Sequence, residues 1–556
     1  MVFWALSIFL GLAQAWESRM DIVNDTISYL DMGNYFFHGH PAALINGIWS
    51  PLDAFLLGAT LRILKPSLQM EYPAVHLLTF LIFLFTLVCF DFFLCQLSRL
   101  APDSSSGLRS DWPWISIAYA IFLCSSLLWI SVYQTNPDML VAAFFFVSCG
   151  LLIRISVGLA SWKPFLVLGV TLGLSYLTKG VMFPLSLVLL ATAWLVAKKK
   201  PSYILISVTA FLLISVPYIV VLSMQKGHLT VGETGIYNYV VHINGIPRHH
   251  WQGGPDGAGV PAHPTRQVFS SPAAFEFNGP LPGTYPVWYD PTFWYEGVKP
   301  QVHVREQIHA VVRNLAGEFE TVFYALNGVI FTTLFVVLYE ARNKPRVLEN
   351  LYRCWFLIVP CVLGLGLYAL VHFEARYGAA FLAVLGVCLF SSVLCAEDFP
   401  KRRLFSGVAI VQLGVLLWLI APPLLFHLRH PWTSDKGSYQ AVAESALEMG
   451  LRPGDQVASL EFSSLTTALW AHLARIQIIA EVYYWPGGPE GDRSGFWDAD
   501  LTTQTELLER LRQSGAKAVI SSESPRGPGA ARWSRIGNTD YYLLWLNPPT
   551  LALQGG

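Results

Sequence analysis

The chain of 556 residues carries few charged side chains and almost no net charge. Only 13% of the residues are Asp, Glu, Lys or Arg, and the formal net charge is −1. Without an excess of basic residues there is no positive field to attract a phosphodiester backbone, which argues against a nucleic-acid partner. So low a charged fraction is also untypical of a soluble globular protein.

The cysteines show no spacing typical of a disulfide framework or a zinc site. The eight cysteines all fall inside apolar runs, and no two of them form a C-x-x-C pair. They are therefore expected to be small buried hydrophobic residues. The polar tail also lacks G-x-G-x-x-G and P-loop motifs, so the sequence does not suggest a nucleotide site.

Long apolar runs are abundant. The chain is 54% hydrophobic and 14% aromatic, and runs of about 20 apolar residues are long enough to cross a bilayer as helices. The sequence thus predicts a polytopic α-helical membrane protein with about eleven transmembrane helices. The expected spans are 2–16, 73–97, 113–133, 138–156, 164–178, 180–197, 202–224, 319–339, 353–371, 378–395 and 404–426.

The first run leaves two interpretations open. It has no basic residues before it and ends in Ala13-Gln14-Ala15, which is similar to a signal-peptidase site. We favour an uncleaved membrane helix, because it would anchor the polar segment that follows.

Basic residues are sorted by loop, and this sorting predicts the orientation. With a cytoplasmic N-terminus, all the basic clusters lie on the cytoplasmic side, as the positive-inside rule requires. The segments 17–72, 225–318 and 427–556 are then outside, and 1–426 is expected to form the membrane domain of a plasma or inner membrane protein. The clusters are Arg99 with Arg109, Arg154 with Lys163, 198–200, Arg342 with Lys344, Arg346 and Arg353, and 401–403.

The tail differs in pattern from the rest of the chain. Helical patterns at 437–450, 463–473 and 501–514 alternate with short apolar strands at 456–460, 476–482, 518–521 and 541–546. This alternation predicts a small three-layer α/β domain outside the membrane.

The long outer loop 225–318 is rich in Gly, Pro and aromatic residues. Its aromatic density favours a surface for a sugar or a lipid headgroup, with His249 and Trp251 as candidate substrate-binding residues. Interfacial anchoring by Trp and Tyr is an equally good interpretation. The histidines His249, His250 and His263 have no fixed spacing that predicts a metal site.

The first outer loop, 17–72, holds acidic residues that a lipid-facing helix would not keep. Within it, Asp25 lies four residues before Tyr29, so on a helix the two share one face, and Asp31 follows. A carboxylate at a water–lipid boundary is suited to act as a general base. An N-terminal helix cap is the plainer interpretation of Asp25. Pro51 to Pro66 is apolar but too short to span, and a helix at the interface is expected.

This acidic loop resembles that of the integral-membrane glycosyltransferases that use polyprenyl-phosphate sugars, the C-type (GT-C) fold. It is most similar to the branch of protein O-mannosyltransferases and aminoarabinose transferases, whose first outer loop begins with an acid followed four positions on by Tyr. Many members have Asp-Glu there, whereas this chain has Asp25-Thr26. The resemblance implies that Asp25 is the catalytic base and that Tyr29 and Asp31 contact substrate.

Three further short motifs match the family. Lys179, in a Leu-Thr-Lys-Gly turn, and Arg376-Tyr377, at the start of a late span, resemble the elements that contact the lipid phosphate. Asp138, after Thr-Asn-Pro, resembles an acidic outer turn and either positions the acceptor or caps a helix. For Lys179 a snorkelling role, and for Arg376 an ion pair with Glu374 or Glu71, are the alternatives.

The resemblance implies an inverting transfer of a sugar from a polyprenyl-phosphate donor to a lipid, glycan or protein acceptor, with membrane lipids as the other partners. Asp25 would remove the acceptor proton, and no metal or other cofactor is required. Two alternatives remain: a transporter or flippase of lipid-linked sugars, and a non-catalytic assembly protein of the membrane. The absence of an inverted repeat disfavours the transporter.

Overall fold

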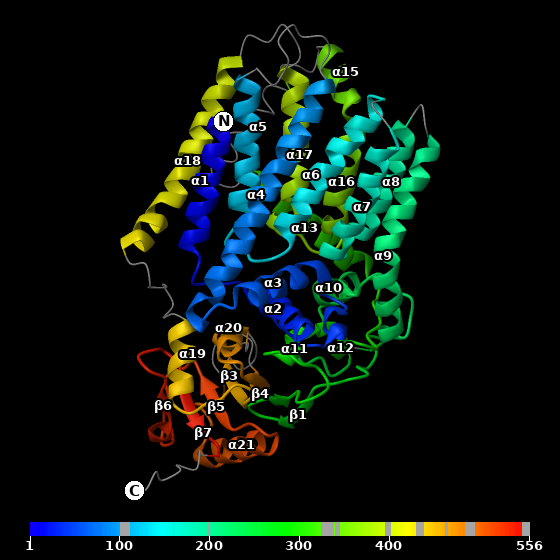
Figure 1. The fold of residues 1–556 in the computed structure, drawn as a ribbon. Helices are drawn as coiled ribbons and strands as arrows, with labels where there is room; N and C mark the ends of the chain where they lie inside the picture. The colour runs from blue at the N-terminus through cyan, green and yellow to red at the C-terminus, as the bar shows by residue number, and fades with distance from the viewer. Residues whose placement is uncertain are drawn as a thin grey trace.

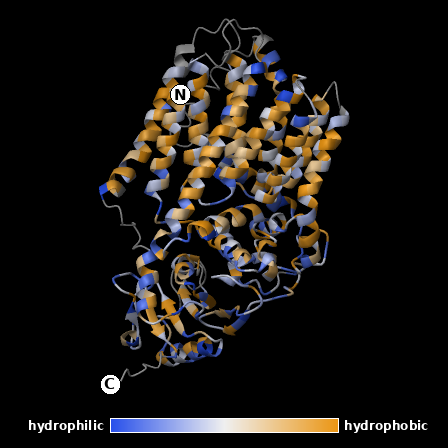
Figure 2. Ribbon diagram, in the orientation of Figure 1, coloured by the Kyte–Doolittle hydropathy of each residue, from blue (hydrophilic) through white to orange (hydrophobic). Residues whose placement is uncertain are grey.

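The computed structural model describes residues 1–100, 112–158, 161–197, 201–254, 256–323, 339, 345–394, 402–429, 439–461, 465–483 and 495–547. It consists of a long helical bundle with a smaller part, containing a β-sheet, at one end (Figure 1). Hydrophobic residues cover the bundle along its length, and hydrophilic residues are frequent at both ends and in the sheet-bearing part (Figure 2). The protein is thus a polytopic α-helical membrane protein with a mixed-sheet domain.

Helices occur at nearly all the predicted spans. In the described part of the chain, six helices are long and apolar enough to cross a membrane, or seven if α15 and α16, which meet at 71°, form one span. The predicted span 319–339 lies mostly outside the described residues, and the total of eleven stays a prediction. The bundle helices are α1 (Val2–Glu17), α4 (Glu71–Leu97), α5 (Trp112–Cys124), α6 (Asp138–Ser156), α7 (Trp162–Thr178), α8 (Met182–Val196), α9 (Ile204–Lys226), α15 (Pro345–Arg353), α16 (Trp355–Ala369), α17 (Ala375–Leu394) and α18 (Arg402–Arg429).

The remaining helices lie at or below the sheet-bearing end of the bundle (Figure 1). The predicted interfacial segment forms a helix, α3. The acidic segment before it contains a second helix, α2, which carries both Asp25 and Asp31. These helices are α2 (Asn24–Phe37), α3 (Pro51–Leu64), α10 (Thr234–His242), α11 (Pro286–Tyr289), α12 (Pro291–Trp294), α13 (Val304–Phe323), α19 (Tyr439–Glu448), α20 (Leu465–Ala474) and α21 (Leu501–Gln513).

The sheet has seven strands in the order β1-β2-β4-β3-β5-β7-β6, with β4-β3-β5 parallel and the outer pairs antiparallel. Apolar residues of α19 and α20 pack with one face and those of α21 with the other, which gives three layers. Two strands come from the long outer loop, a pairing that the sequence pattern did not predict. The strands are β1 (Arg266–Phe269), β2 (Ala274–Glu276), β3 (Gln456–Glu461), β4 (Gln477–Tyr483), β5 (Ala518–Ser521), β6 (Ser534–Arg535) and β7 (Tyr542–Trp545).

Close packing of two glycines fixes α2 against α3. A Cβ atom added to Gly58 would lie 2.7 Å from the Cα of Gly33, and one added to Gly33 would lie 2.3 Å from the carbonyl oxygen of Ala54. Backbones that approach so closely leave no room for any side chain. The orientation of α2 therefore depends on glycine at both positions.

We predict that Gly58→Ala destabilises the protein by about 1–3 kcal/mol, because the new methyl group must push α2 and α3 apart. Thermal unfolding in detergent measures the effect. Gly366→Ala is the matched control, since a Cβ atom there meets nothing within 4 Å and lies inside α16. Equal melting temperatures for the two variants would contradict the proposed packing.

Candidate active site

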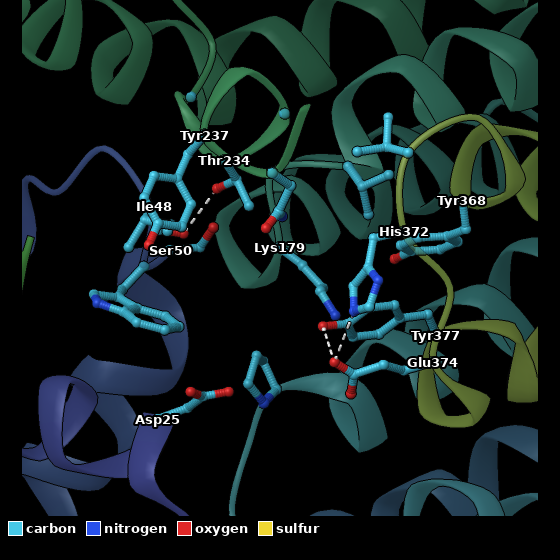
Figure 3. Close-up of a pocket in the computed structure, with 18 of the residues that line it drawn as sticks. Asp25, Ile48, Ser50, Lys179, Thr234, Tyr237, Tyr368, His372, Glu374 and Tyr377 are labelled. Atoms are coloured by element: carbon cyan, nitrogen blue, oxygen red, sulfur yellow. Dashed lines mark hydrogen bonds and ion pairs between the residues drawn. The ribbon is translucent and has the colours of Figure 1, made fainter. Parts of the chain in front are cut away.

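A cavity of about 470 Å³ lies where the bundle meets α2, α10 and the long loop. This volume is in the range of pockets that bind small molecules. Six of the residues named from the sequence stand at this one place: Asp25, Tyr29, Asp138, Lys179, Arg376 and Tyr377 all line the cavity. Figure 3 shows Asp25 across the cavity from Lys179, Glu374 and Tyr377, with Tyr237 on a third side.

Asp25 is in the first turn of α2, where the helix dipole favours a negative charge. Its neighbour Thr26 donates a hydrogen bond of 2.7 Å to the carbonyl of Thr135, in the turn before α6. Two residues on, the hydroxyl of Ser28 donates to the carbonyl of Trp288 at 2.8 Å. The start of α2 is therefore held between the bundle and the long loop, which fixes the carboxylate at the cavity wall.

Arg376 is the centre of an ion cluster that we define as Asp25, Asp138, Lys179, Glu374 and Arg376. Its Nη2 lies 3.4 Å from Oδ2 of Asp25, and its Nε lies 2.7 Å from Oε2 of Glu374 and 3.8 Å from Oδ2 of Asp138. Lys179 Nζ lies 2.5 Å from Oδ1 of Asp138. Three carboxylates and two cations thus meet around one wall of the cavity.

Tyr377 adds an aromatic face and a hydroxyl to this cluster. The Nζ atom of Lys179 lies 3.9 Å from the centre of the Tyr377 ring, which is a cation–π contact. The Tyr377 hydroxyl lies 3.3 Å from Oε1 of Glu374 and accepts a hydrogen bond of 3.3 Å from Arg376. His372 lies 3.2 Å from the same Glu374 carboxylate. The start of α17 and the turn before it therefore gather several donors at one point.

Burial and charge shift the ionisation of the cluster. Burial raises the pKa of Asp25, although Arg376 opposes the shift, and burial lowers the pKa of Lys179, which Asp138 opposes. Burial alone would raise the pKa of Glu374, but its hydrogen bonds with His372 and Arg376 lower it to about 2. Asp25 is thus easier to protonate than Glu374, and a carboxylate with a raised pKa suits a proton acceptor.

Asp53, at the start of α3, is a further acid near this site that the sequence reasoning missed. It is buried, and burial together with the charge of Asp138 raises its pKa to about 7. The signal in the sequence that could have identified Asp53 is an acidic residue within an otherwise apolar run. The cavity residues Tyr237 and Trp288 had no comparable signal, because aromatic residues are frequent throughout the long outer loop.

The structure places the other three predicted binding residues outside the cavity. Asp31 is on α2 and is buried. It accepts hydrogen bonds from the backbone and the hydroxyl of Thr284 at 2.6 and 3.0 Å. His249 is buried between aromatic rings, and burial lowers its pKa to about 4. Trp251 stacks on Tyr295. The three residues therefore do not join the cavity that Asp25 lines: Asp31 faces another side of α2, and His249 and Trp251 are buried within the long loop. Their role in substrate binding stays a prediction.

Comparison with solved structures supports the fold. ArnT from Cupriavidus metallidurans in the apo state matches with a TM-score of 0.54 and 11% sequence identity, over 98% of each chain. ArnT bound to undecaprenyl phosphate matches with a TM-score of 0.53 and 11% identity, over 98% of this chain and 99% of that one. An oligosaccharyltransferase from Archaeoglobus fulgidus gives 0.47 at 11% identity, over 93% and 67%. No protein-family model matches the sequence, and no curated protein matches it either.

This protein is therefore an integral membrane protein with the GT-C fold, which confirms the predicted fold class. Within that class, ArnT is a solved structure that it resembles along nearly its whole length. At 11% identity the likeness establishes the architecture, and the chemistry has to be argued from the cavity.

We predict that Arg376→Gln raises the pKa of Asp25 further, because burial remains while the neighbouring cation is lost. Infrared titration of the protonated carboxyl band, assigned by its loss in Asp25→Asn, measures this pKa. Arg266→Gln is the control, since Arg266 pairs with Glu276 on the exposed edge of the sheet. An unchanged or lower pKa in Arg376→Gln would show that the guanidinium does not act on Asp25.

Proposed function

We propose that the protein is an inverting glycosyltransferase that moves a sugar from a polyprenyl-phosphate donor to an acceptor on the extracytoplasmic side of the membrane. The observation that carries the proposal is the cavity in which Asp25 faces Arg376, Lys179 and Tyr377 within a GT-C fold. A carboxylate beside two cations provides both a base and a phosphate-binding group in one place.

The phosphate of the donor is assigned to Lys179, Arg376 and Tyr377. Arg376 offers a planar fork of donors that matches phosphate oxygens, and Lys179 offers a compact charge. Both cations already contact carboxylates, so a bound phosphate would share them with Asp138 and Glu374. The relative with the same architecture is bound to undecaprenyl phosphate, and we carry this class of lipid over to the present chain.

Apolar residues lead from this end of the cavity toward the bundle. Val181 and Pro184, around the start of α8, and Leu367 and Val371, at the end of α16, line the same cavity. A polyprenyl chain needs such a surface to leave the phosphate and enter the hydrocarbon region. We assign the donor lipid to the region between α8 and α16.

The acceptor is assigned to the wall formed by α10 and the segment after it, where the ring of His242 stacks on that of His372 at 3.9 Å. His242, Asn238 and Arg248 line the cavity there, and the Tyr237 hydroxyl donates to the Arg248 carbonyl at 3.2 Å. Among the described residues, Arg248 has no carboxylate partner and is exposed. It is thus a free donor at the solvent side of the cavity.

The proposed transfer needs one base and no general acid. Asp25 takes the proton of the acceptor hydroxyl or amine, and the acceptor atom forms a bond to the anomeric carbon as the bond from that carbon to the phosphate oxygen breaks. The leaving phosphate gains negative charge, which Lys179 and Arg376 stabilise. Phosphate leaves without a general acid, so a single carboxylate suffices. Attack from the face opposite the phosphate inverts the anomeric centre.

We predict that Asp25→Asn lowers the transfer rate by about 10²–10⁴-fold, because the amide cannot take a proton. The assay is product mass analysis with purified protein and short-chain polyprenyl-phosphate sugars. In the wild type, the rate should rise with pH through the pKa of Asp25, which lies above the ordinary value of about 3.9. Asp256→Asn, on the exposed loop surface, is the control.

Full activity of Asp25→Asn would remove the proposed base. Movement of the lipid-linked sugar across a reconstituted bilayer, with no transfer product, would instead support the transporter interpretation.

We predict that Lys179→Gln and Arg376→Lys each weaken the binding of a short-chain polyprenyl phosphate by about 10-fold or more, because each loses charge-assisted hydrogen bonds to phosphate. Competition against a fluorescent lipid phosphate in detergent measures the affinity. Arg248→Gln is the control within the same cavity and should retain the wild-type affinity. Equal affinities for all variants would contradict the assignment of the phosphate end.

A further inference from the structure

A second cluster of charged residues lies between α2, α4 and α20, and none of its residues lines the cavity. We name it the His472 junction and define it as Asp31, Glu71, His472 and Arg475. The Nδ1 atom of His472 lies 2.8 Å from Oδ1 of Asp31, and its Nε2 lies 2.9 Å from Oε1 of Glu71. The side chains of His472, Asp31 and Glu71 are only 2%, 7% and 4% exposed. The imidazole and the two carboxylates are therefore shielded from water, whereas the Arg475 side chain is 38% exposed.

The junction joins three parts of the chain. Asp31 is on α2, Glu71 begins α4, and His472 is near the end of α20, which belongs to the sheet-bearing domain. Asp31 also accepts hydrogen bonds from Thr284 of the long loop. One imidazole thus links the sheet-bearing domain to the membrane bundle and to the helix that carries Asp25.

The two carboxylates favour a charged imidazole. An ionised carboxylate only accepts hydrogen bonds, so the imidazolium form, in which both ring nitrogens donate, satisfies Asp31 and Glu71 together. The guanidinium of Arg475, with Nη1 3.0 Å from Nε2, opposes this charge. Burial alone would lower the pKa of His472, but the hydrogen bonds to Asp31 and Glu71 raise it above its ordinary value. Arg475 Nη2 lies 2.5 Å from Oε2 of Glu71. With the imidazolium, two cations balance two buried carboxylates.

The position of Asp31 on α2 connects this junction to the cavity. Asp25 and Asp31 are on the same helix of 14 residues, but Asp25 faces the cavity and Asp31 faces α20. Because a helix of this length moves as one body, a contact that holds Asp31 also sets the position of Asp25. The glycine contact with α3 holds the same helix on another side.

We propose that His472 is a positioning residue: as an imidazolium it docks the sheet-bearing domain onto α2 and α4 and thereby holds Asp25 at the cavity. The effect on catalysis rests on the function proposed above, whereas the docking does not.

The docking depends on pH in a defined direction. Since the pKa of His472 is raised in the folded protein, the contribution of the junction is fully present below the unfolded pKa of about 6.5 and is lost as the pH rises through the folded pKa. The groups facing the ring are Asp31 from α2, Glu71 from α4, Arg475 beyond α20 and the hydroxyl of Thr284, 3.4 Å from Nδ1. Around them, the phenols of Tyr72 and Tyr439 are buried nearby.

Hydrogen exchange on the full-length protein in nanodiscs tests the docking. In the wild type, the protection factor of α2 amides, corrected for intrinsic exchange, should fall by about 10-fold or more between about pH 6 and about pH 9, because charge-assisted hydrogen bonds are lost. In His472→Gln, protection should be lower at the acidic pH and should not change with pH. Should this variant not fold, Asp31→Asn, which keeps the shape of the side chain, is measured instead with the same expectation.

His250→Gln is the matched control. His250 lies 2.5 Å from Glu481 and is as buried as His472, but Glu481 belongs to β4 and the pair does not include α2. This variant should keep the wild-type pH dependence of α2. The proposal would be overturned by a pH-independent protection factor in the wild type. It would also be overturned if His472→Gln and Asp31→Asn both kept the wild-type pH dependence of α2 protection.

Transfer kinetics separate the two proposals. A positioning role predicts that His472→Gln lowers kcat while leaving the KM for the donor unchanged, because Lys179 and Arg376 are not moved. If no transfer is detected in any variant, the proposed function fails, but the exchange data still decide whether His472 docks the domain. If transfer occurs and His472→Gln retains the wild-type kcat, the positioning role fails and the proposed function stands.

Discussion

One buried guanidinium connects the parts from which the candidate active site is built. Arg376 contacts Asp25 from α2, Asp138 from α6 and Glu374 from the turn before α17, at 3.4, 3.8 and 2.7 Å. The guanidinium side chain is only 14% exposed, so each carboxylate that is removed leaves its charge less well compensated. The three elements therefore have to stay together, and the cavity forms where they meet.

The second constraint is the contact between the sheet-bearing domain and α2. The Asp31–His472 contact and the sheet formed jointly by β2 and β4 tie the long loop, the tail and the first outer segment to one another. The start of α2 is thus held by the bundle at Asp25, and its middle is held by the sheet-bearing domain at Asp31. The proposed chemistry requires the first contact, and the proposed docking requires the second.

Much of the architecture and about two thirds of the candidate site followed from the sequence. Apolar runs mark helices because backbone groups inside a bilayer must be satisfied within the segment, and the tail pattern anticipated β3, β4, β5 and β7. Short polar motifs at the ends of these runs identified Asp25, Lys179 and Arg376. Neighbourhood in sequence misled at Asp31, because residues on one short helix were assigned to one site although they face different directions.

The sequence by itself determined that the chain crosses a membrane and which polar residues stand at the ends of its helices, because both depend on local hydropathy. Only the tertiary structure decided which of these residues meet. Asp25 and Arg376 are 351 positions apart, and Asp31 and His472 are 441 apart. Such pairings result from the packing of whole helices, and that packing depends on shapes such as the Gly33–Gly58 contact that no local pattern encodes.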